Sequence, residues 1–332
     1  MRYLVTGGAG FIGSHLADAM LLRGDSVVAL DDCSTGSFRN IRHLERHPRF
    51  AFEQGSILDE GLTSMLAGRV DAIVHLAAAV GVQLIVDRPL SSLTTNIRGT
   101  ENVLAAAARA GCKVLVTSTS EIYGKNGSGP IAEDADRILG SPLKTRWSYS
   151  TAKAIDEILA FTYWRDRGTP SIIVRLFNCV GPRQTGNFGM VLPRFVRQAL
   201  ADEELTVYGD GEQRRSFCHV LDTVEALLAL LDAPDAIGEV FNVGAQNEIS
   251  INDLARRVIE MTRSSSGVAH IPYDEAYEEG FEDMQRRVPD ISRVQALTGW
   301  RPTRDLDDII ADVIDHESTQ TVMAAAVEGR AS

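Results

Sequence analysis

Short apolar runs alternate with longer amphipathic stretches along the first half of this chain. The amphipathic stretches repeat apolar residues at helical spacing and predict helices at Phe11–Leu22, Leu90–Ala110 and Tyr149–Arg167. The apolar runs are rich in β-branched residues and predict strands at Tyr3–Thr6, Ser26–Leu30, Phe50–Gln54, Ala72–Leu76, Val114–Thr117 and Ser171–Arg175. Strands and helices that alternate in this way are typical of βαβ units, so we predict an α/β fold with a Rossmann-like, doubly wound parallel sheet.

The pattern changes after about residue 178 of the sequence. Glycine and proline become frequent, as in "GPRQTGNFG" and "YGDGEQRRS", and the expected helices become shorter. We therefore predict a main domain over residues 1–177 and a smaller C-terminal lobe over residues 178–316, with a segment near 219–245 returning to the main sheet. The tail, residues 317–332, lacks a clear apolar face, and we expect it to be flexible.

Composition and charge argue against several kinds of partner. The 332 residues carry a formal net charge of −12 without a basic cluster, which disfavours nucleic acid or an anionic membrane as a partner. The longest apolar stretch, residues 73–86, contains His75 and Gln83 and is too short to span a bilayer. The start "MRYLVTGGAG" lacks a secretory signal pattern, so we expect a cytoplasmic protein. The widely spaced cysteines form no C-x-x-C pair, so we expect neither a metal site nor a disulfide framework.

A glycine motif follows the first predicted strand. In "YLVTGGAGFIGSHL", Gly7, Gly10 and Gly13 lie between that strand and the next predicted helix. Glycine lets the chain turn tightly and lets the backbone approach a diphosphate, while the helix N-terminus supplies N–H donors. Strand, spacing and helix together predict a dinucleotide site rather than a purely structural turn.

An acidic pair ends the second predicted strand. Asp31 lies 18 residues beyond Gly13, where a carboxylate accepts hydrogen bonds from an adenosine ribose. Asp31 and Asp32, with no adjacent arginine, would repel the 2′-phosphate of NADP. We therefore predict NAD as the cofactor.

A tyrosine and a lysine share one face of a predicted helix. Tyr149 and Lys153 in "YSTAK" are four residues apart. An ammonium beside a phenol favours the phenolate, which would make Tyr149 a proton acceptor near neutral pH. An ordinary surface pair is the alternative. The position of the pair one element beyond the hydroxyl-rich strand end "STSEIYG" favours the catalytic role.

These motifs occur with others in an order that resembles one protein family. The segments "TGGAGFIGSH", "HLAA", "NIRGT", "YSTAK", "RLFNCVGPR", "LTVYGDGEQRRSFCHV", "EVFNVG" and "RRVPDIS" cover nearly all of residues 1–315. The chain resembles the extended short-chain dehydrogenase/reductases that act on nucleotide sugars, especially UDP-glucuronate decarboxylases and UDP-glucuronate 4-epimerases. The resemblance implies a UDP-sugar substrate, NAD, a C-terminal lobe that binds the substrate, and a homodimer formed through helices near 90–110 and 149–167.

The resemblance implies a set of cofactor contacts. One position departs from the family, because Ser56 stands where an Asp usually contacts the adenine amino group. The matching positions are Gly7, Gly10, Phe11, Ile12, Gly13, Asp31, Ser34, Thr35, Gly36, Ser56, Ile57, Leu76, Ala77, Ala78, Asn96, Tyr149 and Lys153.

The resemblance also implies the first chemical step. Thr119 would hydrogen-bond the sugar 4-hydroxyl, Tyr149 would remove its proton, and C4 would give a hydride to NAD. Lys153 would tune Tyr149 and hold the nicotinamide ribose.

Substrate contacts are implied mainly in the C-terminal lobe. Asn178 and Arg215 match positions that hold the diphosphate, while Thr206 and Tyr208 match positions near a uracil or thymine ring. Packing alone for Tyr208 and a surface ion pair for Arg215 stay open as alternatives. The other substrate positions are Val191, Arg287, Asp290 and two arginines able to restrain a carboxylate, Arg183 and Arg194.

The step that follows C4 oxidation depends on Glu121 in "STSEIYG". Family decarboxylases carry Thr/Ser-x-Glu here, whereas simple 4-epimerases generally have a small or hydroxyl residue. Ser120 stands where the dehydratases have an acid, which disfavours dehydration. Arg287 in "RVPDI" matches a decarboxylase arginine that would act with Glu121 on a departing carboxylate. Diphosphate binding alone is the alternative role of Arg287.

Two other functions stay open. The block "GPRQTGNFGMVLPRF" resembles UDP-glucuronate 4-epimerases, so epimerisation of UDP-glucuronate or UDP-glucose is the main alternative. A non-catalytic sensor of NAD or a nucleotide sugar is an alternative of another class, although such proteins commonly lose the tyrosine or lysine that this chain keeps. We favour an enzyme that converts UDP-glucuronate through a 4-keto intermediate to a UDP-4-keto-pentose or UDP-xylose.

Overall fold

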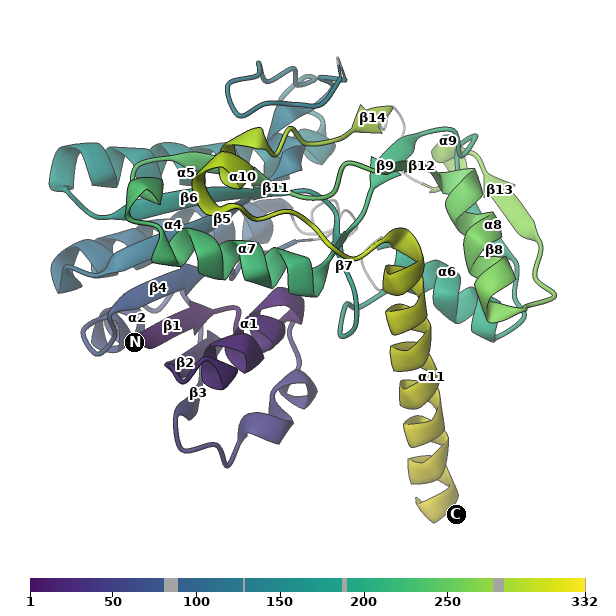
Figure 1. Ribbon diagram of the computed structural model, residues 1–332, viewed down its shortest axis with the longest axis horizontal. Coiled ribbons are helices and arrows are strands. Elements are labelled where there is room, and N and C mark those ends of the chain that lie inside the picture. Colours follow the sequence, from purple (N-terminus) through teal and green to yellow (C-terminus); the bar gives the residue numbers. More distant parts are fainter. Residues whose placement is uncertain (81–88, 128, 187–189, 277–283, 332) are drawn as a thin grey trace.

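The computed structural model describes residues 1–80, 89–127, 129–186, 190–276 and 284–331. The main-sheet strands are β1 (Arg2–Thr6), β2 (Ser26–Asp31), β3 (Phe50–Gln54), β4 (Ala72–His75), β5 (Lys113–Thr119), β6 (Ser171–Leu176) and β11 (Val240–Val243). Among the described residues these seven strands are all parallel and follow the order β11-β6-β5-β4-β1-β2-β3 (Figure 1). The predicted Rossmann-like α/β class is therefore confirmed.

Each face of the main sheet is covered by its own layer of helices. The layers are formed by α1 (Phe11–Leu22), α7 (Val220–Asp232) and α10 (Ser292–Thr298) on one face, and by α2 (Glu60–Ala67), α4 (Pro89–Ala110) and α5 (Ser148–Arg167) on the other. Successive side chains of a strand point to opposite faces, so Tyr3 and Val5 pack under α1, whereas Leu4 packs under α4. The sheet is thus buried on both sides.

The chain returns to the main sheet after it has entered the C-terminal lobe. β11 pairs in parallel with β6, from Val240 opposite Ile173 to Val243 opposite Leu176. α7 contributes Val224 to the apolar core that also holds Tyr3. The segment near 219–245 is therefore part of the main domain.

The C-terminal lobe has an apolar core of its own, which includes Leu192, Phe195 and Leu254. Its helices are α6 (Val191–Leu200), α8 (Ile251–Thr262), α9 (Tyr273–Ala276) and α11 (Leu306–Ala331). Its strands form small sheets: β7 (Cys179–Val180) with β10 (Cys218–His219), β8 (Leu205–Tyr208) with β13 (Val268–Ile271), and β9 (Arg214–Ser216) with β12 (Glu248–Ser250) and β14 (Arg286–Arg287). Figure 1 shows most of these elements on the right of the molecule.

Short 3-10 helices complete the described structure. They are η1 (Phe38–Asn40), η2 (Arg42–Leu44), η3 (Ser120–Tyr123), η4 (Thr145–Trp147) and η6 (Pro234–Ala236).

The final helix is longer than the sequence pattern predicts. α11 continues to Ala331 and includes the segment from Thr319 that we expected to be irregular. A run of good helix formers, Met323–Ala326, accounts for the helical conformation. The flexibility of the tail stays a prediction. Within the described residues, neither α11 nor another helix is both long and apolar enough to cross a membrane.

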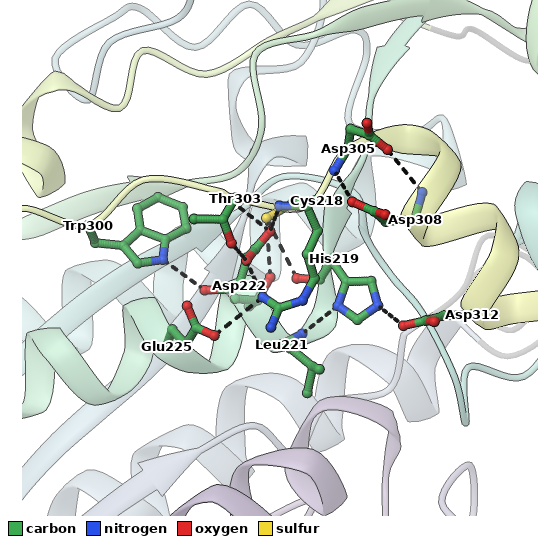
Figure 2. Close-up of polar contacts among 12 residues, drawn as sticks. Cys218, His219, Leu221, Asp222, Glu225, Trp300, Thr303, Asp305, Asp308 and Asp312 are labelled. Carbon is green, nitrogen blue, oxygen red and sulfur yellow. Dashed lines mark hydrogen bonds and ion pairs between the residues drawn. The ribbon is translucent and has the colours of Figure 1, made fainter.

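A buried carboxylate attaches the segment between α10 and α11 to α7 (Figure 2). Asp222, in the first turn of α7, is fully buried. Its carboxylate accepts hydrogen bonds from the Thr303 amide at 3.2 Å, the Thr303 hydroxyl at 3.0 Å and the Arg304 amide at 3.1 Å, and it also pairs with the Arg304 guanidinium. Trp300 donates its indole N–H to the Asp222 carbonyl at 2.9 Å. Because α11 packs in the C-terminal lobe, this contact links the lobe to the main domain.

Replacement of Asp222 tests this link. Asp222→Ala leaves the Arg304 guanidinium and the backbone donors without their acceptor, so the free energy of unfolding should fall by about 3–5 kcal/mol. Glu225→Gln is the matched control, because Glu225 lies 3.3 Å from the same guanidinium but is exposed. The control should change stability by less than about 1 kcal/mol in chemical denaturation. Equal losses for the two variants would show that Asp222 is no anchor.

A buried histidine lies beneath the glycine motif. His75, at the end of β4, makes two hydrogen bonds with threonine hydroxyls. Its Nδ1 lies 2.8 Å from Thr6 Oγ1, and its Nε2 lies 3.0 Å from Thr100 Oγ1. Burial, with a smaller effect of Lys153, lowers the pKa of His75 to about 3. His75 is therefore neutral in the folded protein at every pH near neutrality.

This neutral histidine should make the protein sensitive to acid. An unfolded histidine has a pKa of about 6.5, so below that pH the unfolded chain binds a proton that the folded chain does not. Stability from this source is present above about pH 6.5 and is lost as the pH falls toward 3. Between pH 7.5 and 5.5 the parent should lose about 1.4 kcal/mol more of its unfolding free energy than His75→Gln does. Parallel pH slopes in denaturant titrations would contradict this expectation.

Candidate active site

A cavity of about 780 Å³ lies at the carboxyl ends of β1, β2, β4 and β5 and extends into the C-terminal lobe. The strand order reverses between β4 and β1, and ligands of open parallel sheets bind at such a switch point. Gly7 follows β1, Asp31 ends β2, Leu76 follows β4 and Thr119 ends β5, and all four line the cavity. The topology thus gathers residues that are far apart in the sequence.

The glycine motif forms a turn that larger residues could not occupy. Gly7 has a φ of +71°, and a Cβ at this position would lie 2.8 Å from the Ala77 amide nitrogen. A Cβ on Gly13 would lie 2.1 Å from the Gly7 carbonyl oxygen. The close packing brings the N-terminus of α1 to the cavity, where its backbone N–H groups suit a diphosphate.

Asp31 is held rigidly at the end of β2. Its two oxygens accept hydrogen bonds from the Ala9 amide at 2.9 Å and the Cys33 amide at 2.8 Å. Burial raises the pKa of Asp31, while the backbone donors oppose that effect. Each carboxylate oxygen keeps a second lone pair, so Asp31 fits the role of acceptor for ribose hydroxyls.

Most predicted cofactor residues line the cavity, and two do not. Gly36 lies beside Asp31, where a Cβ would come within 3.0 Å of both carboxylate oxygens. Asn96 lies behind the wall and holds Ala79 through its amide group, at 2.8 and 3.2 Å. Ser56 reaches the cavity, and its hydroxyl accepts a hydrogen bond from the Leu58 amide at 3.2 Å. The lining residues are Gly7, Gly10, Phe11, Ile12, Gly13, Asp31, Ser34, Thr35, Ser56, Ile57, Leu76, Ala77, Ala78, Tyr149 and Lys153.

Binding of NAD and NADP by Asp31→Asn tests the cofactor end. Loss of a charged hydrogen-bond acceptor should weaken NAD binding about 10- to 100-fold, with a smaller effect on NADP, whose 2′-phosphate the carboxylate repels. Asp32→Asn removes the same charge one residue farther on and should have the smaller effect. Isothermal calorimetry gives both affinities. Unchanged NAD affinity in Asp31→Asn would exclude the proposed contact.

The predicted catalytic residues lie in the part of the cavity where β5 is followed by η3. The Thr119 hydroxyl accepts a hydrogen bond from the Glu121 amide at 3.2 Å and so caps η3. Tyr149 and Lys153 project from α5 into the same part of the cavity, and both are buried. The structure therefore brings together the predicted residues Thr119, Glu121, Tyr149 and Lys153.

The electrostatics of Tyr149 differ from the expectation. The Lys153 ammonium donates a hydrogen bond to Asp156 Oδ2 at 2.8 Å, and both side chains are buried. Burial raises the pKa of Tyr149 above its ordinary value, and Glu121 and Asp156 raise it further, while Arg287 opposes them. Lys153 is not among the groups that shift the pKa of Tyr149, because the carboxylate of Asp156 balances its ammonium. The expected role of Lys153 in tuning Tyr149 stays a prediction.

Glu121 lies between two arginines. Arg287, from β14, donates to Glu121 Oε1 at 2.6 Å, while Arg146, from η4, donates to Oε2. Burial opposes ionisation of Glu121, but Arg146 and then Arg287 outweigh it and hold the pKa of this carboxyl well below its usual range. Arg287 also donates to the side-chain oxygen of Asn178. The predicted pair of Glu121 and Arg287 is thus a direct contact, and Glu121 is a carboxylate.

The substrate end contains several predicted residues. The Arg194 guanidinium lies over the Tyr208 ring, 4.4 Å from its centre, and both side chains line the cavity where the resemblance implies an aromatic base. Arg215 is nine-tenths buried and lines the cavity, which favours the predicted role over a pair on the surface. The predicted substrate residues that line the cavity are Asn178, Val191, Arg194, Tyr208, Arg215 and Arg287.

Three predicted substrate residues lie elsewhere. Arg183 forms an ion pair at 2.8 Å with Asp18 of α1, so it does not face a substrate carboxylate as we expected. Thr206 bonds to the Gln198 side chain behind the cavity wall, and its amide is 3.2 Å from the Gln198 oxygen. Asp290 lies just before α10 and accepts a hydrogen bond from the Ser292 amide at 2.8 Å. These contacts give the three residues structural roles.

Arg146 and Gln213 are among the lining residues that were not predicted as site residues. Arg146 lies three positions before Tyr149 in "RWSYSTAK", and a basic residue so close to the catalytic motif was the available signal. Gln213 donates to the Tyr208 carbonyl and to the Tyr273 hydroxyl, each at 3.2 Å. Gln213 stands in the motif "LTVYGDGEQRRSFCHV", which was the available signal, but its contact with Tyr273 depends on a distant segment.

The fold and the site define a class of protein. A glycine turn at the switch point, an acid at the end of the second strand and a Tyr-x-x-x-Lys pair beside the fifth strand are the features of a short-chain dehydrogenase/reductase. A family model described as GDP-mannose 4,6 dehydratase matches residues 4–313. The chain belongs to the extended short-chain dehydrogenase/reductase family of nucleotide-sugar epimerases and dehydratases, which confirms the family predicted from the motifs.

The chain is similar to individual decarboxylases and to a 4-epimerase within this family. The chain is 40% identical over 302 residues to a UDP-N-acetyl-alpha-D-glucosaminuronate decarboxylase of Bacillus cytotoxicus, covering 91% of this chain and 92% of the relative. It is 35% identical over 307 residues to UDP-glucuronic acid decarboxylase 1 of Xenopus tropicalis, covering 92% and 70%. A UDP-glucuronic acid 4-epimerase from Bacillus cereus, solved with UDP-glucuronic acid and NAD, superposes with a TM-score of 0.87 at 31% identity, covering 96% of this chain and 100% of that one.

Proposed function

We propose that this protein is an NAD-dependent decarboxylase of a UDP-hexuronic acid, with UDP-glucuronate as the main candidate. The observation that carries the proposal is Glu121, ionised between Arg287 and Arg146 and next to Tyr149. Relatives named as UDP-hexuronate decarboxylases, at 34–40% identity, support it. The product would be a UDP-4-keto-pentose, or UDP-xylose if the ketone is reduced before release.

Oxidation at C4 is the first step of the proposed reaction. Thr119 and Tyr149 would hold the sugar 4-hydroxyl, and the Tyr149 oxygen would receive its proton. NAD, when bound along the cavity, supplies the hydride acceptor and a positive ring charge that favours the phenolate. Asp31 and the glycine turn would hold its adenosine ribose and diphosphate.

Loss of the carboxylate follows from the chemistry of the ketone. With a ketone at C4 and a carboxylate at C6, the C5–C6 bond can break because its electrons move onto the C4 oxygen. Carbon dioxide leaves, and C5 then takes up a proton. Dehydration would also need an acid that protonates the departing C6 hydroxyl, and Ser120 stands where the dehydratases have that acid, so the site suits decarboxylation better than dehydration.

A 4-epimerase is the second candidate. The likeness to the Bacillus cereus UDP-glucuronic acid 4-epimerase favours it, as does Arg194 at the substrate end of the cavity. Arg183 does not add to that case, since Asp18 neutralises it. A non-catalytic sensor is disfavoured because Thr119, Tyr149 and Lys153 all line one cavity.

We also infer that the protein works as a homodimer in the cytoplasm. α5, one of the two helices expected at the interface, exposes Ile158 by 62% and Phe161 by 42%. Burial of these side chains by a second copy would remove apolar surface from water.

Incubation of the purified protein with NAD and UDP-glucuronate tests the reaction. We expect release of carbon dioxide and, by NMR, a UDP-pentose or its 4-keto form; the 2-acetamido hexuronate is run in parallel to identify the preferred sugar. Glu121→Gln should still form NADH, seen by absorbance, while product falls about 10²- to 10⁴-fold.

Tyr149→Phe is the control, because it should abolish NADH formation as well as product. UDP-galacturonate without carbon dioxide would establish the epimerase instead. Turnover of neither hexuronate, with no change on Tyr149→Phe, would leave the sensor as the function.

A further inference from the structure

Glu121 is shared by two arginines that belong to different parts of the molecule. Arg146 lies in η4, directly before α5, and η3 with Glu121 packs against the same helix. Arg287 comes from β14, in the C-terminal lobe. Each arginine takes one oxygen of the carboxylate. One contact is therefore internal to the main domain, and the other crosses the cavity.

The two arginines are held very differently. The Arg146 guanidinium lies 5.6 Å from the centre of the buried Trp147 ring, a contact that fixes its plane. Arg287 also donates to Asn178, a residue of the cavity wall. The Nε atoms of both side chains are buried and make no hydrogen bond among the described residues. The two differ in where they are attached: Arg146 belongs to the same part of the molecule as Glu121, whereas a ligand that enters the cavity would lie across the contact that Arg287 makes from the lobe.

The proposed substrate would bring a second carboxylate to this place. Arg146 and Arg287 carry two positive charges, and Glu121 supplies a single negative charge between them. The neighbouring Lys153 and Asp156 neutralise each other. A hexuronate carboxylate would complete the balance of two cations and two anions, which a neutral hexose would not.

Resting on the proposed function, we propose that Arg146 is a positioning residue that keeps Glu121 a fixed carboxylate while Arg287 turns from Glu121 to the carboxylate of the substrate. A buried carboxylate that lost both arginines would take up a proton, because burial disfavours its charge. Arg146 prevents this at the moment when Arg287 is engaged elsewhere. The two arginines are thus not interchangeable, although both contact the same side chain.

Direct observation of Glu121 tests the proposal without turnover. Protein labelled with ¹³C at the glutamate carboxyl carbon is compared with Glu121→Gln, which identifies the Glu121 resonance. Without substrate, this resonance should show the carboxylate between pH 5 and 8 in the parent, in Arg287→Met and in Arg146→Met, because each single variant keeps one arginine on Glu121. With UDP-glucuronate bound and NAD withheld, the resonance should titrate within that range in Arg146→Met alone, and Arg146→Lys should restore the carboxylate. Tyr149, Lys153 and Asp156 also face Glu121 and are left unchanged in every variant.

The outcomes separate this proposal from the proposed function. With UDP-glucuronate bound, an unaltered carboxylate in Arg146→Met would overturn the proposal, and so would protonation of Glu121 in Arg287→Met. The second measurement remains informative if Arg146→Met does not fold. With UDP-glucuronate and NAD, Arg146→Met should still form NADH, but its rate of carbon dioxide release should be about 10- to 100-fold lower. That rate should also fall more steeply than in the parent as the pH is lowered. If the parent releases no carbon dioxide, the proposed function fails, and the labelling experiment still decides the role of Arg146.

Discussion

The parallel sheet brings the carboxyl ends of its strands to one edge, and the rest of the structure depends on this constraint. Gly7, Asp31 and Thr119 are separated by long stretches of sequence, but each ends or follows a strand, so all three reach the same cavity. The C-terminal lobe closes the other side of that cavity with Arg215 and Arg287. Cofactor and substrate positions therefore meet where the strand order reverses.

Features set by local pattern could be predicted from the sequence, and features set by distant contacts could not. The predicted strands and helices occur within one or two residues of their expected ends, because alternation and helical spacing are local properties. Arg183 matched a family position, yet its pairing with Asp18 depends on how α1 meets the lobe. Likewise, Tyr149 and Lys153 were found from their spacing, but the effect of Asp156 on their electrostatics required the packed structure.

Two arginines from different parts of the molecule fix the charge state of one glutamate just after β5. Arg146 and Arg287 together hold Glu121 as an anion. The reaction proposed for this scaffold therefore depends on the partners of a single carboxylate as well as on the strand that precedes it. Of these two partners, only Arg287 was predicted from the sequence as a site residue.

The path of the chain between its two parts has a further consequence. β11 and α7 belong to the main sheet although they follow the first strands of the lobe, and Asp222 anchors the chain again before α11. A fragment that stopped at residue 177 would lose an edge strand, β11, and two of the helices that cover one face of the sheet, α7 and α10. Recombination between related genes could therefore not replace the main domain or the C-terminal lobe as one contiguous segment. Changes of substrate in such a fold must arise by substitution and loop variation within one continuous, interlaced chain.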